Sequence, residues 1–292
     1  MEGKLQIVVE FIYSLVNAFI LSLGNIAFRN KIKTCRNNKA FKDRLCGQRC
    51  FVLGNGPSLN SQDLSLLEGE TVFTVNQFLR NDQHTCFKSS FHFWMDNNFF
   101  FFFSHRPEDR ELLDVMINTA NQENIECFYP YNQRSYLMTN GINTDNAHYL
   151  LPILKMHNKY NRNPRIDKYV PGFGTVVLYA VYTAVYMGAS EIYLLGCDET
   201  GIEATIASVL KRENNNYSYS VTDSEKLRME KMVERSGMLQ YAYSYYRTLK
   251  GFEEMLQYCT KRNVKLVNLS AQSVLDMIPS DSLERIVNRT ND

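Results

Sequence analysis

Two common nucleotide-binding signatures are missing from this 292-residue sequence, although it contains a glycine-rich turn of the kind that carries them. The turn is Gly-Asn-Gly-Pro-Ser-Leu at residues 54–59, with Leu59 where a Gly-x-Gly-x-x-Gly motif has its third glycine. No Gly-Lys-Ser/Thr follows, so the turn is not a Walker loop. The next strand-like run ends in Asn76 and Gln77 instead of the acid that holds ribose in dinucleotide-binding folds. These absences argue against a dehydrogenase.

Metal-binding and disulfide patterns are also lacking. The seven cysteines are irregularly spaced, and the close pair Cys46 and Cys50 has no second pair or histidine to complete a zinc site. There is no Asp-x-Asp pair of the kind that metal-dependent nucleotide-sugar transferases use. We therefore expect reduced thiols, a cytosolic body, and neither a resident metal nor a cofactor.

Neither sign of charge is in excess, since 32 basic residues face 31 acidic ones. The basic residues are concentrated in residues 29–49, which hold eight of them and only one acid. The rest of the chain is mildly acidic, and one basic segment on such a body argues against nucleic acid as a partner.

Long apolar runs are scarce, and residues 5–28 form the one such run. It is long enough to span a bilayer, but Glu10, Asn17 and Asn25 interrupt it, and no clear secretory signal is present. Because the basic segment follows directly, we interpret the run as a helix lying on the cytoplasmic face of the inner membrane. A tilted single span is the second interpretation. A helix packed on the body or across a homo-oligomer interface is the third.

The chain accordingly divides into an apolar helix with a basic segment, residues 1–49, and a catalytic domain, residues 50–292. Strand-like runs in the domain are Cys50 to Gly54, Thr71 to Val75, Phe91 to Met95, Ile125 to Tyr129, Glu191 to Gly196 and Val264 to Leu269. Helical patterns are Pro107 to Asn121, Thr175 to Met187 and Ser224 to Lys261. Apolar strands alternating with helices predict an α/β fold with a doubly wound, mostly parallel, Rossmann-like sheet. Gly237 and Gly251 divide the last region into two or three helices.

Two polar segments are predicted to be lids over the active face, residues 131–171 and residues 202–223. The first lacks sustained periodicity, and the second contains an Asn run typical of a mobile loop. Plain surface loops are the alternative for both.

The glycine-rich turn has the composition of an anion site. Gly54 and Gly56 permit close backbone approach, while Pro57 and Ser58 suit the first turn of a helix, whose amide groups favour phosphate. An ordinary strand-to-helix turn would use the same residues. Gly174 and Thr175 repeat the pattern before a later helix.

Acidic residues follow two of the predicted strands, where open α/β sheets bind their ligands. Asp96 follows the third strand, and a general base, a ligand of a sugar hydroxyl and a metal ligand are all possible roles. His105 lies just beyond the same strand end. Asp198 and Glu199 follow the fifth strand. An acid at this place commonly binds ribose, a sugar hydroxyl or the N–H groups of a nearby loop. Capping a helix is the alternative role for Asp198.

Three motifs in this order resemble two related groups of proteins. The motifs are Gly-Asn-Gly-Pro-Ser-Leu at 54–59, Val-Asn-Gln-Phe at 75–78 and Gly-Ala-Ser-Glu-Ile-Tyr-Leu-Leu-Gly-Cys-Asp at 188–198. One group is the small bacterial sialyltransferases that decorate lipooligosaccharide, and the other is the 6-hydroxymethylpterin diphosphokinase MptE-like family. The resemblance covers roughly residues 50–269 and implies a GT-A-type variant of the Rossmann-like fold.

The likeness to sialyltransferases implies an inverting, metal-independent transfer from a CMP-activated acidic sugar. Together with the turn chemistry, it predicts donor-binding residues Gly54, Asn55, Gly56, Pro57, Ser58, Asn76, Gln77, Gly174, Thr175, Asp198, Tyr217 and Tyr219. Those enzymes carry a catalytic histidine in the lid after the Gly-x-Asp strand, whereas no histidine follows His157 here. Asp96 and His105 are therefore the candidate catalytic residues.

The leading interpretation is a membrane-associated glycosyltransferase of bacterial surface-glycan synthesis that acts on a glycan or glycolipid acceptor, and a homo-oligomer is among the expected partners. The first alternative is an MptE-like diphosphokinase that uses ATP and magnesium held by Asp96, Asp198 and Glu199. The second is a non-catalytic nucleotide-binding scaffold.

Overall fold

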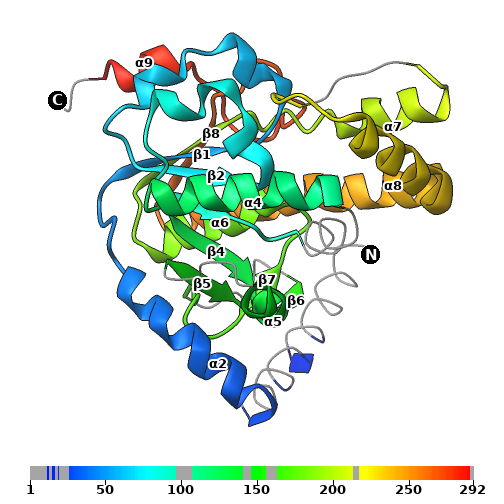
Figure 1. Ribbon diagram of the computed structural model, residues 1–292. Coiled ribbons are helices and arrows are strands. Elements are labelled where there is room, and N and C mark those ends of the chain that lie inside the picture. The colour runs from blue at the N-terminus through cyan, green and yellow to red at the C-terminus, as the bar shows by residue number, and fades with distance from the viewer. Residues whose placement is uncertain are drawn as a thin grey trace.

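A seven-stranded sheet with the strand order β5-β4-β3-β2-β1-β8-β9 forms the centre of the protein (Figure 1). The computed structural model describes residues 12, 15, 16, 19, 26–96, 107–140, 146–155, 163–212 and 217–289. Every pair of neighbouring strands in this sheet is parallel. The predicted α/β class with a doubly wound, mostly parallel sheet is therefore confirmed.

The elements have the following bounds. The strands are β1 (Arg49–Leu53), β2 (Val72–Val75), β3 (Phe91–Phe93), β4 (Glu126–Pro130), β5 (Ala147–Leu150), β8 (Glu191–Leu195) and β9 (Lys265–Asn268), and a second sheet pairs β6 (Pro152–Lys155) with β7 (Val170–Gly172). The α-helices are α2 (Arg29–Cys35), α4 (Pro107–Gln122), α5 (Arg134–Thr139), α6 (Val176–Tyr186), α7 (Gly201–Val209), α8 (Asp223–Thr260) and α9 (Leu283–Val287). The 3-10 helices are η1 (Arg36–Phe41), η2 (Pro57–Ser61), η3 (Leu64–Leu67), η4 (Asn76–Arg80), η5 (Asp82–Cys86) and η6 (Tyr131–Gln133).

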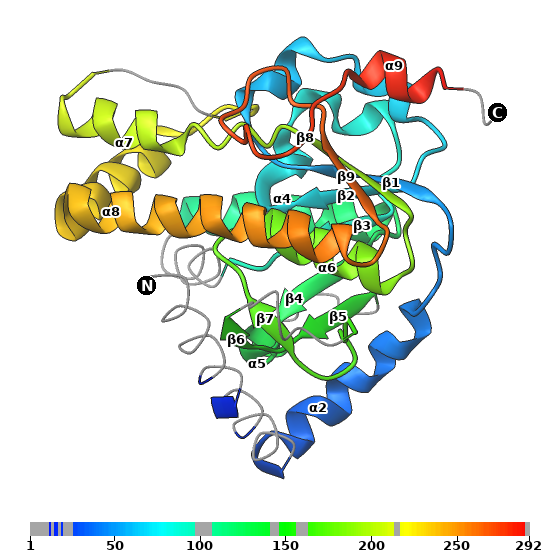
Figure 2. The same ribbon diagram turned by 180° about the vertical axis from the view of Figure 1, so that it is seen from behind.

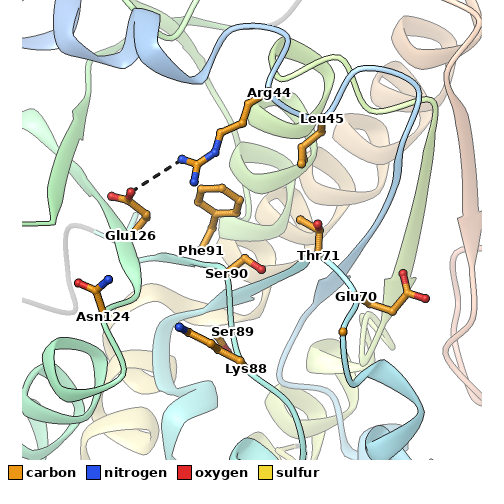
Figure 3. A pocket seen from close by; sticks show the side chains of 11 residues that line it. Arg44, Leu45, Glu70, Thr71, Lys88, Ser89, Ser90, Phe91, Asn124 and Glu126 are labelled. Carbon is orange, nitrogen blue, oxygen red and sulfur yellow. Dashed lines mark ion pairs between the residues drawn. The ribbon is translucent and has the colours of Figure 1, made fainter.

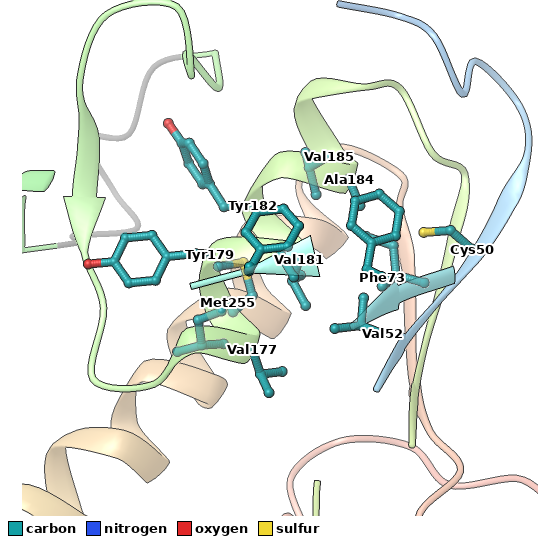
Figure 4. Close-up of a cluster of buried hydrophobic side chains, with 14 of the residues drawn as sticks. Cys50, Val52, Phe73, Val177, Tyr179, Val181, Tyr182, Ala184, Val185 and Met255 are labelled. Atoms are coloured by element: carbon teal, nitrogen blue, oxygen red, sulfur yellow. The ribbon is translucent and has the colours of Figure 1, made fainter. Parts of the chain in front are cut away.

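The two faces of the sheet are covered by different helices. On one face α6 lies between the strands and α8, so all of its residues are buried and its sequence is apolar on every side (Figures 2 and 4). Val52 and Phe73 point into this layer, while the neighbouring Phe51 and Val72 pack with η3 and α9 on the other face. This alternation follows from the two-residue period of a strand.

The order of the strands places a topological switch point beside β1. From β1 the chain builds β2 to β5 on one side, and it returns to the other side of β1 with β8 and β9. The loops after β1 and β8 therefore leave the carboxyl edge of the sheet in opposite directions, which is where open α/β sheets bind ligands.

The described part of the first predicted lid contains regular secondary structure. Residues 131–171 contain α5, β6, β7 and β5, and β5 forms the edge of the main sheet beside β4. Only Tyr149 and Leu150 of β5 are buried, so its sequence carries too weak an alternation to indicate a strand.

The boundary predicted at residue 49 does not separate two packing units. Ile32 and Cys35 of α2 are buried against the body, and Phe41 and Leu45 enter the main core. The Asn38 amide donates hydrogen bonds to the carbonyl groups of Tyr149 (2.9 Å) and Ile166 (2.8 Å). The basic segment is therefore part of the domain, and its lysine and arginine side chains extend from a packed surface.

Most of the predicted amino-terminal helix, residues 5–28, lies outside the described residues. Within the described part of the chain, no helix is both long and apolar enough to cross a bilayer.

The long helical region divides at one of its two glycines. Gly237 has φ 74° and ψ 157°, which kinks α8 into two helices. The helix continues through Gly251. A side chain at this position would begin only 2.9 Å from Leu178 of α6. Two helices were among the expected outcomes, and close packing explains the second glycine.

Candidate functional site

The turns after β1 and β8 interlock at the switch point. The N–H of Gly54 donates to Leu195 O and that of Gly56 to Gly196 O, both at 2.8 Å. A side chain on Gly56 would begin 2.5 Å from the carboxyl carbon of Asp198, and one on Gly54 would collide with Gly196. The two glycines are therefore required by the β8 turn, whatever the site binds.

Asp198 occupies the place where the sequence suggested a phosphate. Its carboxylate, only 2% exposed, accepts hydrogen bonds from the N–H (2.8 Å) and the hydroxyl of Ser58 at the start of η2, which opens with Pro57. Burial raises the pKa of Asp198, and the hydrogen bonds from Ser58 oppose that rise. Because the N–H groups of Gly54, Gly56 and Ser58 all donate within the protein, the expected use of these amides for an anion is not seen. Of the roles predicted for Asp198, binding the N–H group of a nearby loop is the one observed.

The same edge leaves two buried amide oxygens without a partner. Asn55 ties the first turn to β2 by donating from Nδ2 to Val75 O at 3.1 Å. Its Oδ1 and the Oδ1 of Asn76 are buried and have no hydrogen-bond partner among the described residues. A buried, unsatisfied acceptor costs about 1–3 kcal/mol, so a pair of them at a switch point indicates a place for ligand hydrogen-bond donors.

Asn76 is held in an unusual backbone conformation by a histidine that the sequence did not single out. Its φ is 47°, and its carbonyl oxygen lies 2.9 Å from Nε2 of His92, while Nδ1 of His92 lies 2.8 Å from the Thr74 hydroxyl. Burial lowers the pKa of His92 to about 3, so the ring is neutral and has one donor and one acceptor. Donation from Nε2–H to Asn76 leaves Nδ1 to accept from Thr74. The signal that could have pointed to His92 was the position of a histidine inside a predicted apolar strand.

Part of the second predicted lid docks on this edge. Residues 202–209 belong to α7, whereas residues 217–222, called the strap below, lie against the β1 turn and η4. The N–H of Ser218 donates to Asn55 O at 3.0 Å, and Asn81 Nδ2 donates to Ser218 O at 2.9 Å. The strap thereby brings Tyr217 and Tyr219 to the predicted site, with their ring centres 5.1 Å apart.

The remaining predicted residues are placed as follows. Gln77 is buried and accepts a hydrogen bond from Arg80 at 2.7 Å. Gly174 packs against Thr248 of α8, and Thr175 precedes α6 without capping it through its side chain. Asp96 is half-buried and lies three residues beyond β3. His105 lies outside the described residues.

A second acid at the end of β8 has unusual surroundings. Glu199 has φ 53°, and burial together with the charge of Asp198 raises its pKa to about 7. It lies close enough to Tyr245 of α8 for its charge to contribute to the raised pKa of that phenol, after burial. A carboxyl group that changes charge near neutrality suits proton transfer. Within the described ranges, no three His, Cys, Asp or Glu residues are arranged to hold a metal.

A pocket of about 460 Å³ lies at the opposite, amino edge of the sheet (Figure 3). It is lined by residues at the starts of β2, β3 and β4, among them Lys88, Ser90 and Asn124. On the wall of this pocket, Nη1 of Arg44 forms an ion pair with Glu126 Oε1 at 3.8 Å. None of the predicted site residues that the structure describes lines this pocket.

Comparisons with known proteins assign the family. The model of the 6-hydroxymethylpterin diphosphokinase MptE-like family matches residues 22–200. The chain belongs to this family. The match confirms one of the two resemblances drawn from the three motifs. A search of curated proteins found no match to this MptE-like chain.

Two solved structures are similar to this MptE-like chain. The MAf glycosyltransferase from Magnetospirillum magneticum AMB-1 is 12% identical with a TM-score of 0.47, and the match covers 87% of this chain and 38% of that one. The sialyltransferase CstII from Campylobacter jejuni, solved with the substrate analogue cytidine-5'-monophosphate, is 19% identical with a TM-score of 0.39. That match covers 79% of this chain and 83% of CstII. Both TM-scores are below 0.5.

Proposed function

We propose that this protein is a glycosyltransferase that binds the nucleoside part of a CMP-activated sugar at the carboxyl edge of β1 and β2. The observation that carries this proposal is the pair of buried amide oxygens of Asn55 and Asn76 at the switch point, for which the described residues supply no hydrogen-bond donor. Amide oxygens accept hydrogen bonds, so they suit the hydroxyl groups of ribose and the amino group of cytosine.

This arrangement changes the expected orientation of the donor. The phosphate does not bind the amides of Gly54, Gly56 and Ser58, because those amides already donate within the protein. Tyr217 and Tyr219 on the strap and the uncapped start of α6 at Thr175 are the alternatives on the same side of the sheet. A helix start favours an anion through its amide groups and its dipole.

The reaction proposed is an inverting transfer that needs no metal. A hydroxyl group of the acceptor attacks the anomeric carbon and gives its proton to a general base, while the bond to the CMP phosphate breaks and CMP leaves. Asp96 is the first candidate for that base, and His105 is the second. Glu199 joins them because its raised pKa keeps part of it ionised and part protonated near pH 7.

A diphosphokinase is the alternative that the description of the family favours. It would move pyrophosphate from ATP to a hydroxymethyl group and use magnesium held by acids such as Asp96 and Glu199. Asp198 fits that role less well, since both of its oxygens accept hydrogen bonds from Ser58. A non-catalytic nucleotide-binding scaffold is the third possibility.

Titration calorimetry separates these functions. The full chain is titrated with CMP, CDP, UMP, UDP, GDP and ATP, each with and without magnesium. The transferase predicts preferential binding of CMP without magnesium, followed by turnover of a CMP-sugar that Asp96→Asn abolishes. Magnesium-dependent binding of ATP identifies the diphosphokinase, CMP binding without turnover of any CMP-sugar identifies the scaffold, and no binding rejects all three.

We also propose that the protein acts at the cytoplasmic face of the inner membrane, on a glycan or glycolipid acceptor. Support comes from the apolar run at residues 5–28 and from the exposed basic side chains that follow it. Deleting residues 1–25 should abolish sedimentation with vesicles that contain anionic lipids. Unchanged sedimentation of the truncated protein would reject this segment as the anchor.

A further inference from the structure

We propose that Ser218 is a further residue that contacts the bound nucleoside, and that Arg80 positions it. The strap is then a wall of the binding site. This inference rests on the proposed function, because it concerns the same nucleoside site.

Ser218 has the features of a ligand contact that is waiting for a partner. The residue is only 7% exposed, and its hydroxyl oxygen is buried without a hydrogen-bond partner among the described residues. Its backbone is fully engaged, since the N–H donates to Asn55 and the carbonyl accepts from Asn81. This hydroxyl belongs to a residue directly beside Asn55, whose own Oδ1 also has no partner within the described ranges.

The chemistry of the two groups is complementary to one ligand. A hydroxyl group both donates and accepts, whereas the amide oxygen only accepts. A ribose or a nucleobase that carries both kinds of group satisfies the two residues together. Buried polar groups seldom remain unsatisfied. Because Asn55 and Ser218 lie on different loops and are hydrogen-bonded to each other, one bound ligand would satisfy both side chains.

Arg80 holds the strap in place with both terminal nitrogens of its guanidinium group. Its Nη2 donates to Ser220 O at 2.7 Å, and both Nη atoms donate to the carboxylate of Glu225, at 2.8 and 3.1 Å. Nη1 also donates to Gln77 of η4, and the ring of Tyr219 lies 4.8 Å from the guanidinium carbon. The Arg80 side chain is 12% exposed and that of Glu225 is 2% exposed.

The position of Glu225 extends this contact into the start of α8. The carboxylate also accepts from the N–H of Thr222 at 2.9 Å, and the Thr222 hydroxyl accepts from the N–H of Glu225, which forms a capping box. Arg80 therefore joins η4 to the strap and to the helix that follows it. Without the guanidinium, Glu225 would be a buried carboxylate without its cation, and the strap would lose its bond at Ser220.

The experiment uses full-length variants Ser218→Ala, Arg80→Met and the double variant, with CMP as the probe. Arg49→Met is the matched control, because Arg49 forms a comparable two-nitrogen ion pair with Glu70 at the amino edge of the sheet. Titration calorimetry measures affinity, and hydrogen exchange of the Ser218 amide reports whether the strap is docked.

Ser218→Ala should weaken CMP binding about 10-fold, the size of one hydrogen bond to a buried group, without faster exchange. Arg80→Met should weaken binding at least as much and accelerate exchange of the Ser218 amide. The double variant should bind about as weakly as Arg80→Met alone, since Arg80 acts by placing Ser218. Arg49→Met should change neither affinity nor strap exchange.

Each other result has a distinct meaning. If the wild type binds CMP and Ser218→Ala binds it equally well, the contact is rejected while the proposed function stands. If the losses of the two single variants multiply in the double variant, Arg80 does not act through Ser218, and the positioning role is rejected. If the wild type binds none of the nucleotides, the proposed function and this inference fail together.

Discussion

The two edges of one parallel sheet differ in how their polar groups are satisfied. At the amino edge there is an open pocket, and two of the acids that line it are held in ion pairs: Glu126 with Arg44 (Figure 3), and Glu70 with Arg49. At the carboxyl edge the side-chain oxygens of Asn55, Asn76 and Ser218 are buried and have no hydrogen-bond partner in the described part of the chain. Space alone therefore does not mark the candidate site. The grouping of three unsatisfied buried groups at this edge does, because a protein tolerates their cost where a ligand offsets it.

The largest expected effect comes from comparing the removal of two buried carboxylates, Asp198 and Asp167. Asp198→Ala should lower the free energy of unfolding by about 2–3 kcal/mol, since it leaves the Ser58 N–H without its charged acceptor, and it should also weaken CMP binding by loosening the β1 turn. Asp167, equally buried and bonded to Arg165, is the control. Asp167→Ala should destabilise the protein without changing CMP affinity. Denaturant titration and calorimetry measure both, and equal loss of affinity in both variants would contradict the comparison.

The second prediction concerns the two ends of β8. Glu199 follows its carboxyl end with a pKa raised to about 7 by burial and the charge of Asp198, while at its amino end hydrogen bonding from Tyr193 lowers the pKa of Glu191. The native state thus binds the Glu199 proton more tightly than the unfolded state, so stability falls as pH rises from about 4.5 to about 7. For Glu191 the sign is opposite: its contribution is present above pH 4.5 and is lost as pH falls.

Glu199→Gln should therefore raise the free energy of unfolding at pH 8 by about 1–2 kcal/mol after solvent screening, and should have little effect at pH 4.5. Glu191→Gln should lower stability at pH 8 and lose that effect at low pH. Denaturant titrations between pH 4 and pH 8 measure both. A Glu199→Gln variant with the same pH slope as the wild type would show that this carboxyl group is not perturbed.

The smallest expected effect compares two asparagines in the left-handed region. Asn76 at the carboxyl edge has φ 47°, and Asn124 in the amino-edge pocket has φ 56°. Glycine adopts this conformation without strain, so either Asn→Gly change should stabilise the protein by about 0.5–1 kcal/mol. Only Asn76→Gly should also weaken CMP binding, by about 10-fold, because it removes an unpartnered oxygen. An equal effect of Asn124→Gly on affinity would move the site to the other edge.

Much of the sheet could be predicted because buried parallel strands are short, nearly continuous apolar runs. Six predicted strands match β1, β2, β3, β4, β8 and β9 to within two residues at each end. β5, β6 and β7 were missed, since β5 buries only two of its four residues and β6 and β7 are too short to produce a pattern. For the same reason residues 131–171 resembled a loop.

The candidate site was located by sequence but explained differently by the structure. Asn55 and Asn76 lie at the predicted edge of the sheet. The glycines on either side of Asn55 are required because the β8 turn packs too closely for a side chain there. His92 was passed over because a lone histidine has no informative spacing. Its contacts with Thr74 and Asn76 depend on neighbouring strands, not on neighbours in sequence.

The sequence by itself determined the α/β class, most of the strands of the main sheet and the loops that meet at the switch point, because local hydrophobic period and turn chemistry encode them. Only the tertiary structure decided which groups in those loops are free to bind. Asp198 lies 140 residues from Ser58, and Glu225 lies 145 residues from Arg80. Such pairings satisfy some polar groups and leave others without partners, and no local pattern carries that information.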